Sequence, residues 1–143
     1  MKVRQLSVFL ENRSGRMARV TRLLGDAGIN IRALSIADTA DFGILRLIVN
    51  DPDRAAEVLR SAGFSVRNTD VVAIEVPDRP GGLAGVLEAL GGADINVEYL
   101  YAFVGQSEKK AVVVFRFEDT ARALEVLDGL GVKALDAATV YAL

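Results

Sequence analysis

The stretch Asn12-Arg13-Ser14-Gly15-Arg16-Met17-Ala18 recurs 66 residues later as Asp78-Arg79-Pro80-Gly81-Gly82-Leu83-Ala84. The same shift places Leu24–Ile31 on Leu90–Val97, and the two segments share Leu-Gly at their start and Ile-Asn near their end. Similarity of a sequence to itself at a fixed period is typical of a repeated structural unit. The chain is therefore predicted to contain two copies of one module.

The register of the repeat changes once along the chain. A shift of 68 aligns Asp51–Gly63 with Asp119–Gly131, so two extra residues are expected in the second copy, near Gly105–Lys109. The copies divide near Asn68–Asp70. We predict one module at residues 1–69 and a second at residues 70–143.

Each module is predicted to begin with a strand and a helix. Val3–Leu10 and Val71–Val76 are rich in β-branched residues with partial alternation, which is typical of strands. Apolar residues then recur at spacings of three and four from Met17 and from Leu83, which predicts a helix in each copy.

A hairpin, a second helix and a short strand complete each module. Second helices are expected to begin at Asp51-Pro52-Asp53 and at Glu118-Asp119-Thr120, because Asp suits a helix cap and Pro suits the first turn. The remaining strands are expected at 29–37, 42–49 and 64–67 in the first copy, and at 95–104, 111–117 and 138–141 in the second.

The order βαββαβ, found twice, predicts an α+β fold of two ferredoxin-like modules. Right-handed connections would place two helices on one face of a four-stranded antiparallel sheet. A module of about 70 residues hides only roughly 60% of its surface. We therefore expect the two modules to pack together or to form one eight-stranded sheet, and we expect the chain to form a homodimer.

Composition limits the chemistry that the chain can perform. It has 143 residues, 51% of them hydrophobic, and a net charge of −2, which excludes disorder and argues against nucleic-acid binding. It has no His and no Cys, so thiolate and imidazole chemistry and the usual zinc sites are excluded. No apolar run reaches membrane-spanning length. We expect a cytoplasmic protein with no metal, no cofactor and no membrane partner.

The segments that repeat best lie between the first strand and first helix of each copy. A helix start carries free N–H groups and a partial positive charge, so it can hold a carboxylate. Gly15 and Gly81 let a ligand approach the backbone, and Asn12 or Asp78 could accept a hydrogen bond from an ammonium group. This combination suits an α-amino acid.

The same residues have a purely structural interpretation. Asn12, Ser14 and Asp78 are ordinary helix caps, and Asn30 and Asn96 could fix the entry to a strand through bonds to the backbone. The residues alone leave both interpretations open.

The motifs resemble those of the ACT domain, a small ligand-binding regulatory module. Asp78–Leu83 matches its helix-opening pattern, and Gly28–Ile31 and Asp94–Val97 match its Gly-x-Asn-Ile entry to the second strand. Ser14 stands where that pattern has Pro, and Asp94 stands where it has Gly. The resemblance covers essentially all 143 residues and is to stand-alone tandem ACT proteins that lack a catalytic domain.

The resemblance implies a non-enzymatic regulator that binds a free amino acid at the interface between ACT modules. Its partner would be an enzyme of amino-acid metabolism or a transporter, and no catalytic residue is expected. The candidate ligand-binding residues are Asn12, Arg13, Ser14, Gly15, Arg16, Met17, Asn30, Asp78, Arg79, Pro80, Gly81, Gly82, Leu83 and Asn96.

Two further expectations concern arginines near the first turn. Of the arginines at 13, 16, 19 and 22, only Arg16 is predicted near the edge of the core, where it could reach a ligand; because its counterpart is Gly82, the two sites need not share a ligand. The alternative function is a small acylphosphatase-like hydrolase on the same topology, with Arg13 holding an anion and Asn30 positioning water.

Overall fold

The computed structural model describes residues 2–38, 41–103 and 110–143, and the chain forms two compact units. The amino-terminal unit comprises Arg4–Thr69 with Tyr141–Leu143. The carboxy-terminal unit comprises Asp70–Val140 with residues 2–3. Each unit therefore includes a few residues from the opposite end of the chain.

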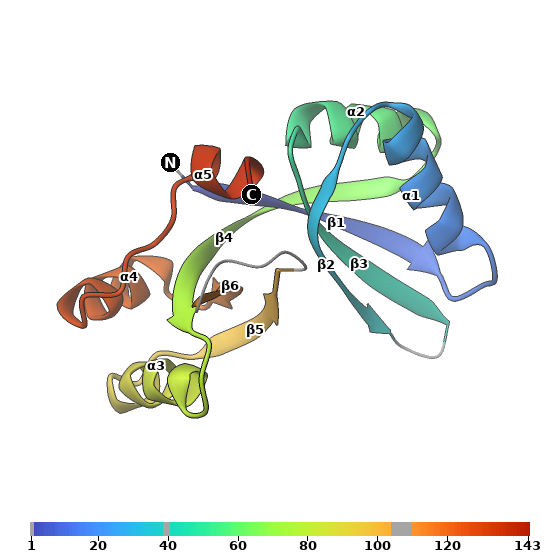
Figure 1. The fold of residues 1–143 in the computed structure, drawn as a ribbon. Coiled ribbons are helices and arrows are strands. Elements are labelled where there is room, and N and C mark those ends of the chain that lie inside the picture. Colours follow the sequence, from blue (N-terminus) through green and yellow to red (C-terminus); the bar gives the residue numbers. More distant parts are fainter. Residues whose placement is uncertain (1, 39–40, 104–109) are drawn as a thin grey trace. The chain divides into compact units, whose positions relative to one another are not determined.

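The amino-terminal unit has a sheet with the strand order β2-β3-β1-β4 (Figure 1). Leu6 of β1 lies opposite Leu47 of β3, and β2 also pairs with β3 in the antiparallel sense. Its elements are β1 (Val3–Glu11), α1 (Arg16–Asp26), β2 (Ile31–Asp38), β3 (Phe42–Val49), α2 (Pro52–Ser61) and the beginning of β4 (Ser65–Pro77).

Both helices of this unit cover one face of its sheet. Leu45 and Leu47 alternate along β3 and are buried, and they share a core with Leu24 of α1 and Leu59 of α2. The two-residue period of the strand and the three-to-four-residue period of the helices thus meet in one apolar layer. Burial of these aliphatic side chains is the main force that holds the unit together.

The carboxy-terminal unit repeats this plan around the strand order β4-β6-β5. Ile74 of β4 and Phe115 of β6 are fully buried with Leu90 of α3 and Leu127 of α4. Its further elements are α3 (Gly82–Gly92), β5 (Val97–Ala102), β6 (Lys110–Phe117), α4 (Thr120–Gly129) and α5 (Ala137–Tyr141). The predicted fold class, two tandem ferredoxin-like modules with antiparallel sheets, is confirmed.

The prediction of separate strands at 64–67 and 71–76 is wrong. A single strand, β4, runs from Ser65 to Pro77, and the boundary between the units falls inside it, between Thr69 and Asp70. The polar run Arg67–Asp70 resembles a linker, but it contains no Gly or Pro to interrupt an extended backbone.

The prediction of a last strand at 138–141 is also wrong, because this segment forms α5. The backbone N–H of Thr139 donates to Oδ1 of Asp136 at 2.7 Å, and the N–H of Val140 donates to the carbonyl of Asp136 at 3.1 Å. These bonds start a helix, and the Thr139 amide lowers the pKa of the Asp136 carboxyl. Contact with β4 comes just before this helix, where Ala134 forms a bridge with Ile74 and the N–H of Leu135 donates to the carbonyl of Ala73 at 2.8 Å.

The structure therefore has six strands in its described ranges rather than the eight expected from the repeat. The predicted extra residues near Gly105–Lys109 fall outside the described residues. None of the helices in the described ranges is long and apolar enough to cross a membrane.

Candidate functional site

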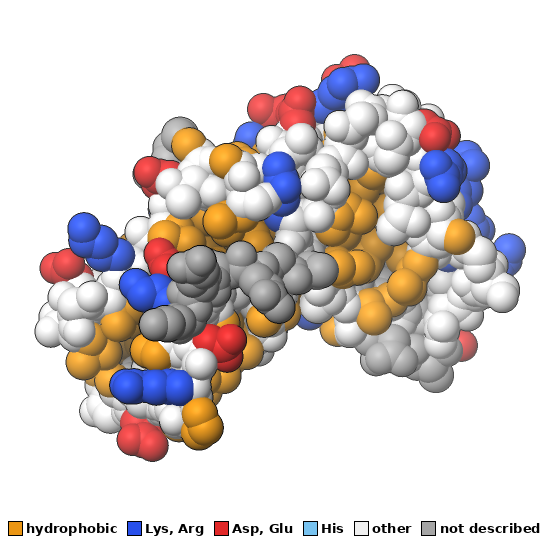
Figure 2. All heavy atoms as spheres, in the orientation of Figure 1, with side chains coloured by type: hydrophobic (Ala, Val, Ile, Leu, Met, Phe, Trp, Pro, Cys, Tyr) orange, Lys and Arg blue, Asp and Glu red, His pale blue; other side chains and the backbone are white. Residues whose placement is uncertain are grey.

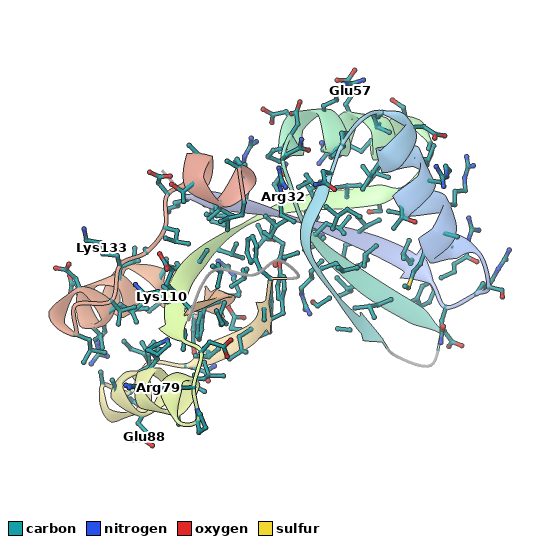
Figure 3. The ribbon with its side chains drawn as sticks, in the orientation of Figure 1. Arg32, Glu57, Arg79, Glu88, Lys110 and Lys133 are labelled. Carbon is teal, nitrogen blue, oxygen red and sulfur yellow. The ribbon has the colours of Figure 1, made fainter. Side chains whose placement is uncertain are left out.

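The β1–α1 turn (residues 12–15) and the β4–α3 turn (residues 78–81) have the same backbone hydrogen bonds. In the first turn, the N–H of Arg13 donates to the carbonyl of Glu11 at 2.8 Å, and the N–H of Arg16 donates to the carbonyl of Arg13 at 3.3 Å. The equivalent bonds in the second turn are 2.9 and 3.0 Å long. The sequence repeat is thus a repeat of backbone geometry, and Arg79 projects from the second turn beside α3 (Figure 3).

A glycine caps each of these helices. Gly15 and Gly81 have φ angles of 88° and 84°, in the left-handed region that favours glycine, and no side chain caps either helix. The interpretation of Asn12, Ser14 and Asp78 as helix caps is therefore wrong. The first-turn N–H groups of α1 and α3 are left without a side-chain cap, as anion binding requires.

The second helix of each unit provides a contrast. Oδ1 of Asp51 accepts a hydrogen bond from the N–H of Arg54 at 3.2 Å, and Oδ1 of Asp119 accepts one from the N–H of Arg122 at 3.1 Å. These carboxylates cap α2 and α4, as predicted. Of these four helices, only α1 and α3, which follow the repeated turns, lack a side-chain cap.

A carboxylate lies between two arginines at the β1–α1 turn. Glu11 Oε2 is 3.1 Å from Arg13 Nη1, and Glu11 Oε1 is 3.3 Å from Arg16 Nη2. Nε of Arg16 is buried and has no hydrogen-bond partner. Figure 2 shows a group of basic side chains over α1, among other basic side chains on the same face. Arg19 and Arg22 of this helix are exposed, whereas Arg16 is half-buried, as predicted.

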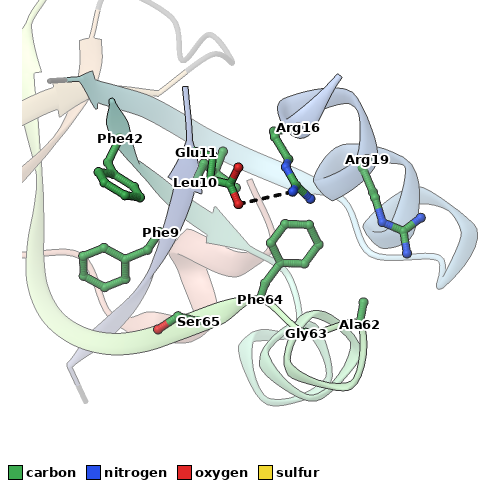
Figure 4. A pocket seen from close by; sticks show the side chains of 10 residues that line it. All are labelled: Phe9, Leu10, Glu11, Arg16, Arg19, Phe42, Ala62, Gly63, Phe64 and Ser65. Atoms are coloured by element: carbon green, nitrogen blue, oxygen red, sulfur yellow. Dashed lines mark hydrogen bonds and ion pairs between the residues drawn. The ribbon is translucent and has the colours of Figure 1, made fainter. Parts of the chain in front are cut away.

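Arg16 and Glu11 line a pocket of about 310 Å³ in the amino-terminal unit (Figure 4). Phe64, from the turn between α2 and β4, lies beside Arg16, and the full lining is Phe9, Leu10, Glu11, Arg16, Arg19, Phe42, Ala62, Gly63, Phe64 and Ser65. Of the candidate ligand residues, this pocket contains only Arg16. No sequence pattern pointed to the other lining residues as a site, although the predicted end of a helix at Gly63 did indicate a turn there.

The counterpart of Arg16 cannot carry a side chain. A Cβ built on Gly82 would lie 2.1 Å from the carbonyl oxygen of Pro77 and 3.1 Å from its carbon. Pro77 also occupies the position equivalent to Glu11. The β4–α3 turn therefore lacks both members of the ion pair that Glu11 and Arg16 form.

Asn30 does not lie near the β1–α1 turn of its own unit. The register of β3 places Glu11 opposite Phe42 and Ile31 opposite Val49, at the two ends of the strand. At about 3.3 Å per residue, the turn and Asn30 are roughly 23 Å apart along the sheet. The structure thus separates Arg13 from Asn30, and the pair proposed for a hydrolase is not assembled.

The bonds that the structure gives Asn30 are made by its backbone and not by its side chain. Its N–H donates to Oδ1 of Asn50 at 3.0 Å, and its carbonyl accepts from the N–H of Asn50 at 3.2 Å. Asn96, its counterpart, accepts a hydrogen bond at its carbonyl from the N–H of Glu118 at 3.3 Å. Register again places Asn96 and the β4–α3 turn at opposite ends of a strand, β6.

The polar pocket beside Asn96 has a volume of about 450 Å³ and also contains Asp94. Asp94 has a φ of 58°, in the left-handed region where its counterpart Gly28 has a φ of 73°. Asp replaces Gly here without changing the turn, because Asp tolerates this conformation better than most residues with a side chain.

Comparisons with known proteins identify relatives of the whole chain. The family of the ACT domain pair matches residues 1–136. A crystal structure of a protein from Bacteroides thetaiotaomicron is 45% identical, covers 100% of this chain and 98% of its own, and has a TM-score of 0.93.

Two further relatives are more distant. The ligand-free regulatory subunit of aspartate kinase from Thermus thermophilus is 17% identical over 90% of this chain and 93% of its own, with a TM-score of 0.67, which shows a shared fold. The acetolactate synthase small subunit of Buchnera aphidicola is 41% identical over 49 residues, 34% of this chain. The match spans only 31% of that relative.

Proposed function

This chain belongs to the ACT domain pair family, and from that membership we propose that it is a non-enzymatic regulatory protein that binds a free amino acid between ACT modules. The binding residues would be those of the two repeated turns, Asn12–Met17 and Asp78–Leu83. Asn30 and Asn96 each lie at the end of the sheet opposite the repeated turn of their own unit. Each could therefore contact a ligand only at the turn of another module.

The observation that carries this proposal is the pair of helix starts that have the same backbone turn and no side-chain cap. An α-carboxylate can accept hydrogen bonds from first-turn N–H groups that no side chain caps, and the absence of a Cβ on Gly15 and Gly81 lets it come close. Asn12 or Asp78 would accept from the ammonium group. A zwitterion satisfies both requirements.

The names of two relatives support the proposal that this chain regulates another protein. One is named as a regulatory subunit of aspartate kinase and another as a small subunit of acetolactate synthase. We propose a cytoplasmic homodimer that acts on an enzyme or a transporter of amino-acid metabolism. The ligand would shift the equilibrium between two arrangements of the modules. The size of that shift is set by the difference in the ligand's affinity for the two arrangements.

The hydrolase alternative has less support. Its two candidate residues, Arg13 and Asn30, lie at opposite ends of one sheet, and Arg13 is paired with Glu11. No observation favours acyl-phosphate hydrolysis over ligand binding.

The test is thermal unfolding of the full chain in the presence of each standard amino acid. A ligand that binds the folded state stabilises it by about 2.7 kcal/mol at 100 times its Kd, so at least one amino acid should raise the melting temperature. No shift with any amino acid at millimolar concentration would overturn the proposal.

Two matched variants locate the binding site. Asp78→Ala should weaken binding, because it removes the acceptor for the ammonium group. Asp128→Ala, an exposed change on α4 of the same unit, should bind as the wild type does. Equal weakening in both variants would argue against a site at the β4–α3 turn.

A further inference from the structure

The pocket beside Arg16 combines opposite charges with an apolar wall. Its volume of about 310 Å³ lies at the lower end of the range for small-ligand sites. Glu11 and Arg16 supply the charges, and Leu10 and Phe64 supply apolar surface next to them (Figure 4). The pocket lies wholly within the amino-terminal unit.

The ion pair in this pocket can be separated at little cost. The side chains of Arg16 and Glu11 are 33% and 46% exposed, and their closest atoms are 3.3 Å apart. Exposed pairs of this kind contribute little to stability. If Arg16 turned away, Glu11 would keep Arg13 as a partner at 3.1 Å.

Arg16 also has an unused donor. Its Nε is buried without a hydrogen-bond partner, while its Nη2 forms the ion pair with Glu11. A carboxylate prefers to bind a guanidinium through two parallel bonds, such as those from Nε and Nη2. A ligand carboxylate that engaged both atoms would satisfy a donor that the protein leaves unpaired.

We propose that this pocket binds an α-amino acid with an apolar side chain, through its carboxylate on Arg16 and its ammonium group on Glu11. The ligand's side chain lies against Phe64 and Leu10. This inference rests on the proposed function and narrows the ligand class at the first of its two turns. There it places the selecting residues, Arg16 and Glu11, beside the β1–α1 turn rather than in it, and the β4–α3 turn with Asp78 takes no part in this pocket.

At the equivalent positions, which the structure describes, the carboxy-terminal unit lacks this charge pair. Gly82 and Pro77 replace Arg16 and Glu11, and Val132 replaces Phe64. The contact between Gly82 and the carbonyl of Pro77 leaves no room for a side chain. The chain therefore binds one such amino acid, not two.

Calorimetric titration of the full chain with leucine, phenylalanine, glutamate and 4-methyl-2-oxopentanoate tests the proposal. The last compound is leucine with its ammonium-bearing carbon oxidised to a ketone, so it keeps the carboxylate and the apolar side chain. We expect leucine or phenylalanine to bind at one per chain and at least tenfold more tightly than glutamate or the oxo acid.

Three variants assign the contacts. Arg16→Gln should weaken binding of the apolar amino acid at least tenfold, whereas Arg22→Gln, on the same helix but outside the pocket, should not change it. Glu11→Gln should remove the preference for leucine over its oxo acid. The melting temperature of each variant without ligand shows that it is folded.

The outcomes separate this inference from the proposed function. If an amino acid binds Arg16→Gln as tightly as the wild type, or if glutamate binds best, the inference is overturned and the proposed function stands. If no amino acid binds the wild type, both are overturned.

Discussion

The two repeated turns share a backbone and differ in the side chains they carry. Each has a left-handed glycine before its helix and the same hydrogen bonds 66 residues apart. The first presents Glu11 and Arg16 beside a pocket, whereas the second packs Gly82 against the carbonyl of Pro77. The same position of the repeat thus binds a ligand in the first turn, as we propose for Arg16, and allows close backbone packing in the second, as Gly82 does.

This difference shows how a duplicated module can hold its fold while changing its chemistry. The glycine conformation and the turn hydrogen bonds are local, so they recur wherever the sequence recurs. The position after the glycine is not restricted in the same way, because the space available to its side chain depends on the strand before it. Substitutions near the two turns should therefore have effects on stability that differ in sign and size.

The largest expected effect is that of Gly82→Ala. Its Cβ would lie 2.1 Å from a backbone oxygen, which no rotation of a side chain can relieve, so the helix or the strand must shift. We expect a loss of about 3 kcal/mol in the free energy of unfolding, at the upper end for overpacking. Urea denaturation at neutral pH measures it.

Gly85→Ala is the matched control on the same helix. Its Cβ would have nothing within 4 Å, and alanine favours helix, so this variant should be more stable by about 0.5–1 kcal/mol. Similar effects at both positions would show that the contact between Gly82 and Pro77 is not what distinguishes the two turns.

A smaller effect is expected from the side-chain caps. Asp51→Ala and Asp119→Ala should each lower the free energy of unfolding by about 1 kcal/mol, because each removes a bond to a backbone N–H at a helix start. Ser14→Ala should change it by less than about 0.5 kcal/mol, since Gly15 caps α1. A loss for Ser14→Ala as large as that for Asp51→Ala would show that α1 has a side-chain cap after all.

The smallest expected effect is a pH dependence at α5. The Thr139 amide lowers the pKa of Asp136 in the folded state from the ordinary value of 3.8. The stabilisation from this carboxylate is therefore present above about pH 4 and is lost as the pH falls through the lower folded pKa. Urea midpoints of the wild type and Asp136→Asn should differ at pH 6 and converge in that acidic range. A difference that stays constant down to pH 2.5 would contradict this assignment.

Much of the fold could be predicted because it depends on the type and spacing of residues that are close together in the sequence. Asp51 and Asp119 cap the helices that follow them, as their position before Pro52 and Thr120 indicated. The half-buried position of Arg16 followed from the helical period, which places it near Val20 on the edge of the apolar face. These features need no information about residues far away in the chain.

The wrong predictions of secondary structure lie where contacts with distant segments of the chain determine the conformation. The segment from Arg67 to Asp70 has the composition of a linker, yet it is extended within β4. The segment 138–141 has the composition of a strand, yet Asp136 starts a helix there, and the bridge to β4 lies before that helix, at Ala134. Short segments have weak preferences of their own, so their neighbours in space select the structure.

The sequence by itself determined that there are two modules, the order of their main elements, and the two glycine-containing turns that lead into the first helix of each module. Only the tertiary structure decided what lies beside those turns. Phe64 reaches Arg16 across 48 residues of chain, and the carbonyl of Pro77 closes the space at Gly82. Backbone conformation is chosen by neighbours along the chain, whereas a pocket is formed by side chains that meet only when the core is packed.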